Sequence, residues 1–447
     1  MDWTLKGDRN TKFFHAMASS RQARNTINSI TVGNASFEEP NAVKQEVWNH
    51  FSNMFTDDWK IRPVLTGDFK SVRSSPSFHL LEAEFSEEEI WAAIKDCNGN
   101  KAPGPDGFNL LFFQKFWKLL KVDILNFMKD FYANGKLAPG LSSSFITLIP
   151  KKEKAVSLNE YRPICLIGSA YKILSKVLTA RLQQVLPTVI GDSQLAFLRG
   201  RSILDGVLIA NEVVDGWHKS KKTGLLFKLD FEKAFDSINW NFLFSMLTNF
   251  GFGQKWISWM RECVSTARIS VLINGSPTKE FSPQKGLRQG DPLSPLLFNL
   301  VVEALNILFQ RAMELNLLKG VSIGFNQVRL SYLQFADDSL LFCEAKLSEV
   351  LALKRLLRCF EMASGLKINY HKSVVCGVGV SISELAVFAS LLNCKTQTLP
   401  LKYLGLPLGA NPRRKKTWQP VIDKFKLRLA GWKRRLLSFA GQLILIT

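Results

Sequence analysis

The sequence predicts an α+β fold in which an antiparallel sheet packs on helices. Short apolar runs typical of buried strands, such as Leu225–Leu229, alternate with stretches of helical periodicity, such as Tyr171–Leu186. The strongest local signal lies at Tyr332–Cys343, where two apolar runs flank the adjacent carboxylates of Asp337 and Asp338. This pattern predicts a β-hairpin with the Asp pair in its turn, although an Asp pair is also found in simple Asx turns.

Length and composition indicate a large globular protein with a polyanionic partner. The 447 residues are enough for two to four domains, and 46% of them are hydrophobic. Lys and Arg total 58 against 38 Asp and Glu, which gives a formal net charge of +20. Nucleic acid is the first partner that this excess predicts, and an anionic membrane surface is the second. The cations are spread along the chain, which favours a long positive channel over a basic tail.

The cysteines and the apolar segments exclude several classes of protein. Seven cysteines without a Cys-x-x-Cys pair, and five scattered histidines, argue against a zinc site or a disulfide framework and favour a reducing compartment. The start of the sequence lacks the apolar core of a signal peptide. No uninterrupted apolar run approaches the ~20 residues needed to span a bilayer. The most apolar region, Pro292–Phe309, is interpreted as a buried helix.

Helices are predicted in chain order from periodicity, caps and stop signals. The first 80 residues are polar and basic: Lys12–Arg24 fits a helix on nucleic acid or a solvated helix face, and Ser71–Phe78 fits a loop or linker. Ser86, with Glu89 at capping-box spacing, starts the next helix. The further helices expected are Tyr171–Leu186, Ile203–His218, Ser237–Phe250, Ser348–Ala363 and a basic pair over Lys424–Ile446.

Strands, turns and loops separate these helices. Phe145–Pro150 and Arg268–Ile273 are predicted strands, and Asn274-Gly275 is a hairpin signal after the second. Tyr161–Ile164 is expected to form a basic turn, and Lys402–Gly409 a hairpin. Gly and Pro mark loops at Lys101–Gly107 and Gln284–Pro295.

A third carboxylate, Asp230, ends the predicted strand Leu225–Leu229. If that strand pairs beside the hairpin, Asp230 and Asp337 converge at one edge of the sheet. Carboxylates in this arrangement can hold two divalent ions about 3.5–4 Å apart, which stabilise the attacking and leaving oxygens of a phosphoryl transfer. Mg²⁺ suits such a site because it prefers hard oxygen ligands and tolerates few of them from protein.

The ordered motifs resemble those of reverse transcriptases. Leu229–Asp236 is similar to the first catalytic motif of that family, and Phe335–Asp338 to its catalytic hairpin, with Gly286–Pro295 between them. More narrowly, the chain resembles plant long interspersed elements, which are non-LTR retrotransposons. Further motifs in that family's order are Lys101–Gly107, Leu148–Lys151, Tyr161–Ile164, Gly365–Ser373 and Tyr403–Gly409.

The resemblance implies a right-hand polymerase with fingers, a palm and a helical thumb. The expected division is a basic extension or linker over 1–80, fingers and the start of the palm over 81–222, and the palm over 223–400. Residues 401–447 would be a primer-grip hairpin and a truncated thumb. The implied activity is RNA-directed DNA polymerisation with two Mg²⁺ ions, or Mn²⁺, using an RNA template, a DNA primer or target and dNTPs.

Family members also carry an endonuclease, so we expect this sequence to be a fragment whose endonuclease lies in a missing N-terminal segment or another chain. The implied location is the nucleus, with a cytoplasmic ribonucleoprotein stage. Three alternatives stay open: a catalytically inactive nucleic-acid-binding remnant, an enzyme like an intron maturase, and a viral-type RNA-dependent RNA polymerase.

The resemblance also implies roles for single residues. Asp230, Asp337 and Asp338 would be catalytic and hold metal, together with the backbone carbonyl of Phe231. Phe235 would exclude a ribose 2′-hydroxyl, although a core aromatic fits the same position. The implied nucleotide-binding residues are Lys151, Lys152, Arg162, Phe235, Gln289, Gly290 and Lys372. Contacts to primer or template are expected from Lys176, Arg181, Tyr403 and Gly405.

Overall fold

The computed structural model describes residues 25–430 apart from 60, 154, 325–327 and 412, together with residues 15, 19, 20, 22 and 23. The side chains of 323 and 427–430 are also outside the description. Most of the predicted helix Lys12–Arg24, and the part of Lys424–Ile446 after residue 430, therefore lie outside the described residues.

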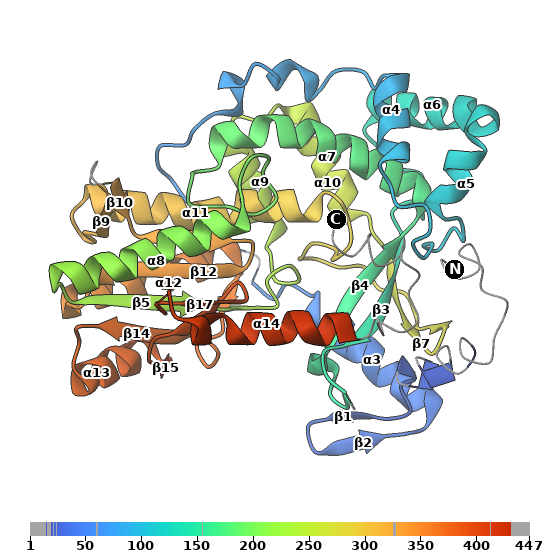
Figure 1. The fold of residues 1–447 in the computed structure, drawn as a ribbon. Helices are drawn as coiled ribbons and strands as arrows, with labels where there is room; N and C mark the ends of the chain where they lie inside the picture. Colours follow the sequence, from blue (N-terminus) through green and yellow to red (C-terminus); the bar gives the residue numbers. More distant parts are fainter. Residues whose placement is uncertain are drawn as a thin grey trace, which may run out of the picture.

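A five-stranded sheet forms the centre of the molecule and confirms the predicted α+β class (Figure 1). Its order is β11 (Tyr332–Phe335), β12 (Asp338–Glu344), β5 (Gly224–Leu229), β14 (Val374–Val378) and β15 (Lys395–Thr396). All neighbours are antiparallel except β14 and β15. The predicted pairing of the hairpin with the strand before Asp230 is therefore confirmed.

Each face of this sheet packs on helices because its side chains alternate between two apolar cores. Leu225 and Phe227 of β5 lie in the larger core with α9 (Trp240–Asn249), α11 (Ser294–Glu314) and α12 (Leu347–Ser364). Leu226 lies in the smaller core with α8 (Ile203–Ser220). In Figure 1, α8 runs alongside strands β12 and β5 of this sheet.

A second sheet lies beside the helices of the N-terminal half. It has the order β4 (Tyr161–Ile167), β3 (Ser144–Pro150), β7 (Ile269–Ile273) and β8 (Ser276–Pro277), and the pair β3–β7 is parallel. The helices of this half are α3 (Pro40–Met54), α4 (Glu87–Lys95), α5 (Leu110–Lys115), α6 (Trp117–Asn134), α7 (Ser169–Val189) and α10 (Gln254–Ser265).

Short strand pairs and two later helices complete the described fold. The pairs are β1 (Ile30–Val32) with β2 (Ala35–Phe37), β6 (Phe231–Glu232) with β13 (Lys367–Ile368), β9 (Val321–Ile323) with β10 (Val328–Leu330), and β16 (Leu401–Tyr403) with β17 (Leu406–Leu408). The later helices are α13 (Ile382–Leu392) and α14 (Lys415–Ala430). The predicted hairpin over Lys402–Gly409 is confirmed by β16 and β17.

Four local predictions differ from the structure. The hairpin turn consists of Ala336 and Asp337, because Asp338 already pairs with Phe335 as the first residue of β12. The predicted basic turn Tyr161–Ile164 is part of strand β4. The predicted Ser237 cap is wrong: α9 begins after Asn239, whose side chain accepts the Phe242 N–H at 2.8 Å.

The fourth difference concerns the N-terminal region. Ser71–Phe78, predicted as a loop or linker, contains a short 3₁₀ turn at Val72–Ser74, and Val72 is fully buried. Ile30, Val47 and Phe51 are buried in the larger core as well. The described part of this region is therefore integral to the fold.

The predicted buried helix is α11. By length and composition it is the one helix in the described part of the chain that could cross a membrane, but 72% of its most apolar window is buried inside the protein. Tyr332 of β11 stacks on Phe309 of α11 with ring centroids 5.6 Å apart. The hydrophobicity of α11 is thus explained by its position against the central sheet.

Candidate active site

Strand pairing brings the three predicted catalytic aspartates together at one edge of the central sheet. Ser339 of β12 is the partner of Leu229 of β5, so Asp338 and Asp230, the next residue outward on each chain segment, lie together at the end of this strand pair. Asp337 precedes Asp338 in the hairpin turn. Asp230 and the pair Asp337–Asp338, which are more than one hundred positions apart in sequence, therefore form one cluster of carboxylates.

The backbone of Asp230 is fixed from its other side. Its N–H donates to Ser373 Oγ at 3.1 Å, and its carbonyl accepts the Asn369 N–H at 2.8 Å. In an antiparallel ladder, pairs that share hydrogen bonds alternate with pairs that do not. Because Asp230 is bonded to Asn369, the next pair, Phe231 with Ile368, is of the other kind, and the Phe231 carbonyl points away from β13. The Phe231 carbonyl is thereby available as an oxygen ligand beside Asp230.

Burial and like charge act together on these carboxylates. Burial raises the pKa of Asp230, Lys372 lowers it, and Asp337 raises it further. Burial also raises the pKa of Asp338, with Lys228 opposing and the other two aspartates adding to the effect. Lys228 Nζ lies 4.0 Å from Asp338 Oδ1. The cluster therefore carries negative charge that a cation would stabilise.

The donor set fits a hard divalent cation. No three His, Cys, Asp or Glu side chains among the described residues are gathered closely enough to hold a metal alone. Mg²⁺ does not need such a cage, because it usually binds one or two carboxylates and completes its shell with water and substrate phosphate. Asp230, Asp337 and the Phe231 carbonyl are oxygen donors of the type that such a site needs.

A group of cations adjoins the carboxylates. Burial lowers the pKa of Lys151, and the positive charges of Lys372, Arg162 and Lys233 lower it further. Lys372 also lowers the pKa of Asp230, so the cluster of cations borders the cluster of carboxylates. Mutual repulsion among these cations makes the position suited to an anion with several charges, such as a triphosphate.

The resemblance implied this role for both Lys151 and Lys152, but their contacts in the structure differ. Lys151 joins the cation group, with its Nζ donating to the Asn159 carbonyl at 2.8 Å. Lys152 forms an ion pair of 2.6 Å with Glu160 instead. Of the two, Lys151 is therefore the one that belongs to the group of cations beside the carboxylates.

The loop that carries Gln289 is seated against both the first catalytic motif and β4. Gln289 Nε2 donates to both carboxylate oxygens of Asp236, at 3.2 and 3.3 Å, and its carbonyl accepts the Cys165 N–H at 2.7 Å. Gly290 has φ +113°, and a Cβ there would lie 2.8 Å from the Cys165 carbonyl oxygen. Glycine is required at this position for both reasons.

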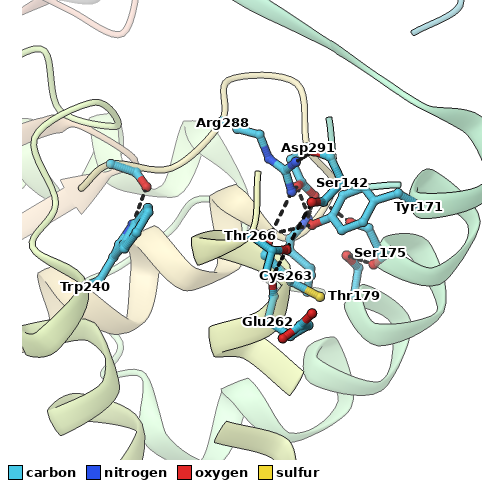
Figure 2. Close-up of polar contacts among 12 residues, drawn as sticks. Ser142, Tyr171, Ser175, Thr179, Trp240, Glu262, Cys263, Thr266, Arg288 and Asp291 are labelled. Carbon is cyan, nitrogen blue, oxygen red and sulfur yellow. Dashed lines mark hydrogen bonds and ion pairs between the residues drawn. The ribbon is translucent and has the colours of Figure 1, made fainter. Parts of the chain in front are cut away.

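Buried polar groups beneath this loop hold its ends (Figure 2). Arg288 donates to the carbonyls of Ser142 and Cys263 at 2.6 and 2.9 Å and pairs with Asp291 at 2.8 Å. Asp291 also accepts from Tyr171 at 2.8 Å and Ser175 at 2.5 Å. This Arg288–Asp291 network connects the loop to α7 and α10, so Gln289 and Gly290 lie between two anchored residues.

A family comparison agrees with this geometry. Residues 149–408, more than half of the chain, match the model of the family described as reverse transcriptase (RNA-dependent DNA polymerase). The chain belongs to the reverse transcriptase family. The family is generally dependent on divalent metal. This reverse transcriptase has the predicted α+β fold, with the three aspartates at one edge of the central sheet.

Relatives of this reverse transcriptase include transposon proteins. A transposon TX1 protein of 149 kDa from Xenopus laevis is 27% identical over 98% of this chain and 34% of its own length. The Pol polyprotein of the type-2 retrotransposable element R2DM of Drosophila melanogaster is 26% identical over 76% of this chain and 32% of its own length. The chain thus spans about a third of these relatives.

A shorter match comes from a plant. An uncharacterized mitochondrial protein of Arabidopsis thaliana is 48% identical over 71 residues, which are 16% of this chain and 58% of that protein.

Phe235 of the reverse transcriptase follows Asp230 by five residues and contacts the loop that carries Gln289. Its ring is half-buried and stacks on Phe298 of α11 at 4.8 Å, and its carbonyl accepts the Leu287 N–H at 2.7 Å. One side of the ring is therefore packed like that of a core aromatic, and the ring is partly exposed. This position is compatible with a core role and with exclusion of a ribose 2′-hydroxyl, the two interpretations given by the sequence.

Of the four residues predicted to contact primer or template, Lys176 and Gly405 are accessible. Lys176 pairs with Asp96 at 2.6 Å and lines a cleft of about 620 Å³ with Lys101, Lys172 and Gly290. Gly405, with φ +89°, is exposed in the turn between β16 and β17. Lys228 Nζ donates to the Lys402 carbonyl at 3.2 Å, which places this hairpin beside Asp338.

The side chains of Arg181 and Tyr403 are buried instead. Arg181 is 4% exposed; it donates to both oxygens of Glu89, at 2.7 and 2.8 Å, and to three backbone carbonyls. Tyr403 is fully buried in the smaller core. The structure contradicts direct nucleic-acid contact by these side chains, because a periodic helix face or a hairpin motif does not show whether a polar side chain points inward.

Sequence reasoning missed three residues of the site: Lys228, Lys233 and Asp236. Lys228 is adjacent in sequence to the catalytic strand end, and its charge acts on both Asp230 and Asp338. Lys233 and Asp236 stand in the same motif as Phe235 but were given no role. A basic residue two positions before Asp230, pointing to the opposite face from its neighbours, was the available signal for Lys228.

Asp236 gives the site a pH dependence that can be measured. Burial raises its pKa to about 7, while Gln289, Lys233 and Lys151 lower it. The Asp236 carboxyl therefore binds its proton more tightly in the folded protein than in the unfolded chain. The protonated side chain favours folding at low pH, and this contribution to stability is lost as the pH rises from about 4 through 7. Asp236→Asn should therefore gain thermal stability relative to wild type between about pH 5 and pH 8.

The measurement is the difference in unfolding temperature between variant and wild type at each pH. Buried Glu303 also has a pKa raised to about 7, so the slope of the wild type alone does not isolate Asp236. A variant-minus-wild-type difference that stays constant across this range would contradict the assignment.

Proposed function

We propose that this chain is the RNA-directed DNA polymerase of a non-LTR retrotransposon, more narrowly of a plant long interspersed element. The pairing of β5 with β12, which brings Asp230 and Asp338 together next to the cations around Lys151, is the observation that carries the proposal. Similarity to proteins of transposable elements from a frog and a fly supports the element class. The match to an Arabidopsis protein supports the plant assignment.

Each part of the site has a task in nucleotidyl transfer. Asp230, Asp337 and the Phe231 carbonyl would hold two Mg²⁺ or Mn²⁺ ions, and Asp338 would be the less directly bound neighbour. When bound, the metal supplies charge stabilisation for the primer 3′-oxygen and the leaving pyrophosphate. Lys151 and Arg162 hold the triphosphate of a dNTP through charge-assisted contacts, and Lys372 offers a proton at its Nζ to pyrophosphate.

Nucleic acid would reach this site through two surfaces. The cleft lined by Lys101, Lys172 and Lys176 suits the phosphates of an RNA template, because burial and the neighbouring lysines lower the pKa of Lys172 and an anion would relieve that repulsion. The exposed turn at Gly405 lies on the hairpin beside Asp338 and suits the DNA primer end.

Polymerisation on primed RNA tests the proposal. The purified chain, with Mg²⁺ and dNTPs, should extend a DNA primer annealed to RNA. A catalytically inactive remnant would bind the same RNA with a steep dependence on salt but would show no turnover. An intron-maturase-like enzyme would extend the primer and would also promote RNA splicing, so a splicing assay separates that alternative.

Cellular context is a further part of the proposal. Target-primed copying occurs on chromosomal DNA, so we expect the chain in the nucleus after a cytoplasmic ribonucleoprotein stage. An endonuclease in another segment or another chain would expose the DNA primer end.

Discrimination against ribonucleotides should depend on Phe235. Phe235→Ala is expected to raise the incorporation of rNTPs relative to dNTPs about 10-fold or more, because the ring would no longer meet the 2′-hydroxyl. Incorporation of paired rNTP and dNTP substrates gives the ratio. Phe235→Tyr keeps the ring and should keep the discrimination. An unchanged ratio in Phe235→Ala would assign Phe235 to the core alone.

A further inference from the structure

The turn that carries Asp337 has an unfavourable backbone conformation. Ala336, the other turn residue, has φ +55°, in the left-handed region that costs an L-residue about 1–2 kcal/mol. Such a turn persists only where neighbouring groups hold it. Since Asp337 follows directly, whatever fixes Ala336 also fixes the position of the Asp337 carboxylate.

Gln194 makes the side-chain contact to this turn. Its Oε1 accepts the Ala336 N–H at 3.3 Å and the Ala196 N–H at 2.9 Å. Gln194 is 2% exposed, and its Nε2 has no hydrogen-bond partner within the described chain. The amide is therefore engaged through its oxygen.

The main chain around Gln194 also covers the outer edge of the catalytic hairpin. Ser193 accepts the Gln334 N–H through its carbonyl at 2.8 Å, and the Leu195 N–H donates to the Gln334 carbonyl at 2.8 Å. Gln194 thus forms a parallel bridge to Gln334 of β11, the edge strand of the sheet. Backbone and side chain together fix the register between this segment and the turn.

This segment is itself anchored to α11. Asn299 Nδ2 donates to the Ala196 carbonyl at 2.8 Å, and Glu303 accepts the Gly191 N–H at 3.1 Å. Arg201 donates to the carbonyls of Gly191, at 2.6 Å, and of Gln194. We call residues 191–201 the turn bracket, because they connect the buried helix to the catalytic turn.

We infer that Gln194 is a positioning residue for catalysis: its amide oxygen holds the Ala336–Asp337 turn so that Asp337 faces Asp230. The inference rests on the proposed polymerase function. Removing the oxygen leaves the nucleotide-contacting residues intact, so kcat and metal affinity should fall while KM for dNTP stays close to wild type. Groups that orient metal ligands typically contribute about 10–100-fold to activity or metal affinity.

The test compares Gln194→Met, which keeps the length of the side chain without a hydrogen-bond acceptor, with Gln194→Glu, which keeps an oxygen there. Turnover per active site is measured in single-turnover experiments on primed RNA, and Mn²⁺ binding is followed by electron paramagnetic resonance without substrate. Gln194→Met should lower kcat and Mn²⁺ affinity about 10–100-fold. Gln194→Glu should restore most of both. Asn249→Leu is the control for loss of a part-buried amide: Asn249 of α9 donates to the Leu65 carbonyl at 3.2 Å and has no role in the site, so this variant should retain kcat.

Each outcome decides the inference. Wild-type kcat and Mn²⁺ affinity in Gln194→Met would overturn it, as would failure of Gln194→Glu to restore them, since packing alone would then explain the loss. If Gln194→Met does not fold, Gln194→Glu with near-wild-type turnover and Mn²⁺ affinity supports the inference, and loss of both overturns it. If the wild type extends no primer, the proposed function fails, and the Mn²⁺ titrations decide the inference alone.

Discussion

Asp337→Asn is expected to lower primer extension on RNA by about 1,000-fold, because losing a carboxylate ligand removes several kcal/mol of charge stabilisation from the transition state. The substitution keeps the size of the side chain, so the turn between Phe335 and Asp338 should persist. Extension of a labelled primer by the purified variant, at saturating dNTP and Mg²⁺, measures the effect.

The control is Asp215→Asn, which removes a half-exposed carboxylate paired with Lys219 on α8. That variant should extend primers at the wild-type rate, because exposed ion pairs contribute little. Comparable extension by Asp337→Asn and wild type would remove Asp337 from the catalytic group. Asp338→Asn should have a smaller effect than Asp337→Asn, in keeping with the less direct role we propose for it.

Asp291→Ala is expected to destabilise the fold by about 3–5 kcal/mol, the cost of leaving a buried partner charge uncompensated. Arg288 would keep its two carbonyl contacts but lose its counter-ion, and the Tyr171 and Ser175 hydroxyls would lose their acceptor. Urea denaturation followed by tryptophan fluorescence gives the shift in midpoint.

The matched double variant Arg288→Met/Asp291→Leu replaces both charges with apolar groups of similar volume. It should recover a large part of the lost stability, because a buried ion pair often contributes little more than a well-packed apolar pair. Equal destabilisation in the single and double variants would show that the hydrogen bonds to Tyr171 and Ser175, and not the unpaired charge, dominate the network.

The central sheet and the convergence of the three aspartates at its edge could be predicted from the sequence for physical reasons. Leu225–Leu229 and the runs flanking Asp337 are short, apolar and rich in strand formers, so their burial leaves little choice of structure. The exact turn could not be predicted, because the Ala336 N–H within it bonds to Gln194, a residue of a distant segment that the local sequence pattern does not reveal.

The roles of single polar side chains were harder to predict. Arg181 has the spacing of a helix face exposed to nucleic acid, yet Glu89 and three carbonyls pair it inside the protein. Lys151 and Lys152 have equal propensities, and they differ in their partners: Lys151 bonds the Asn159 carbonyl, whereas Lys152 pairs with Glu160. In each case the deciding partner lies on another element, which local sequence patterns do not encode.

The loop that carries Gln289 packs closely against the segment Phe235–Ile238, and this limits how the nucleotide site can be redesigned. A Cβ at Gly286 would lie 2.6 Å from the Asp236 carbonyl oxygen, and the Gly286 and Leu287 N–H groups donate to the carbonyls of Ile238 and Phe235, each at 2.7 Å. The two walls of the site are therefore joined backbone to backbone. An engineer seeking acceptance of bulkier nucleotide analogues would have to shorten side chains, since loop insertions here would separate the walls.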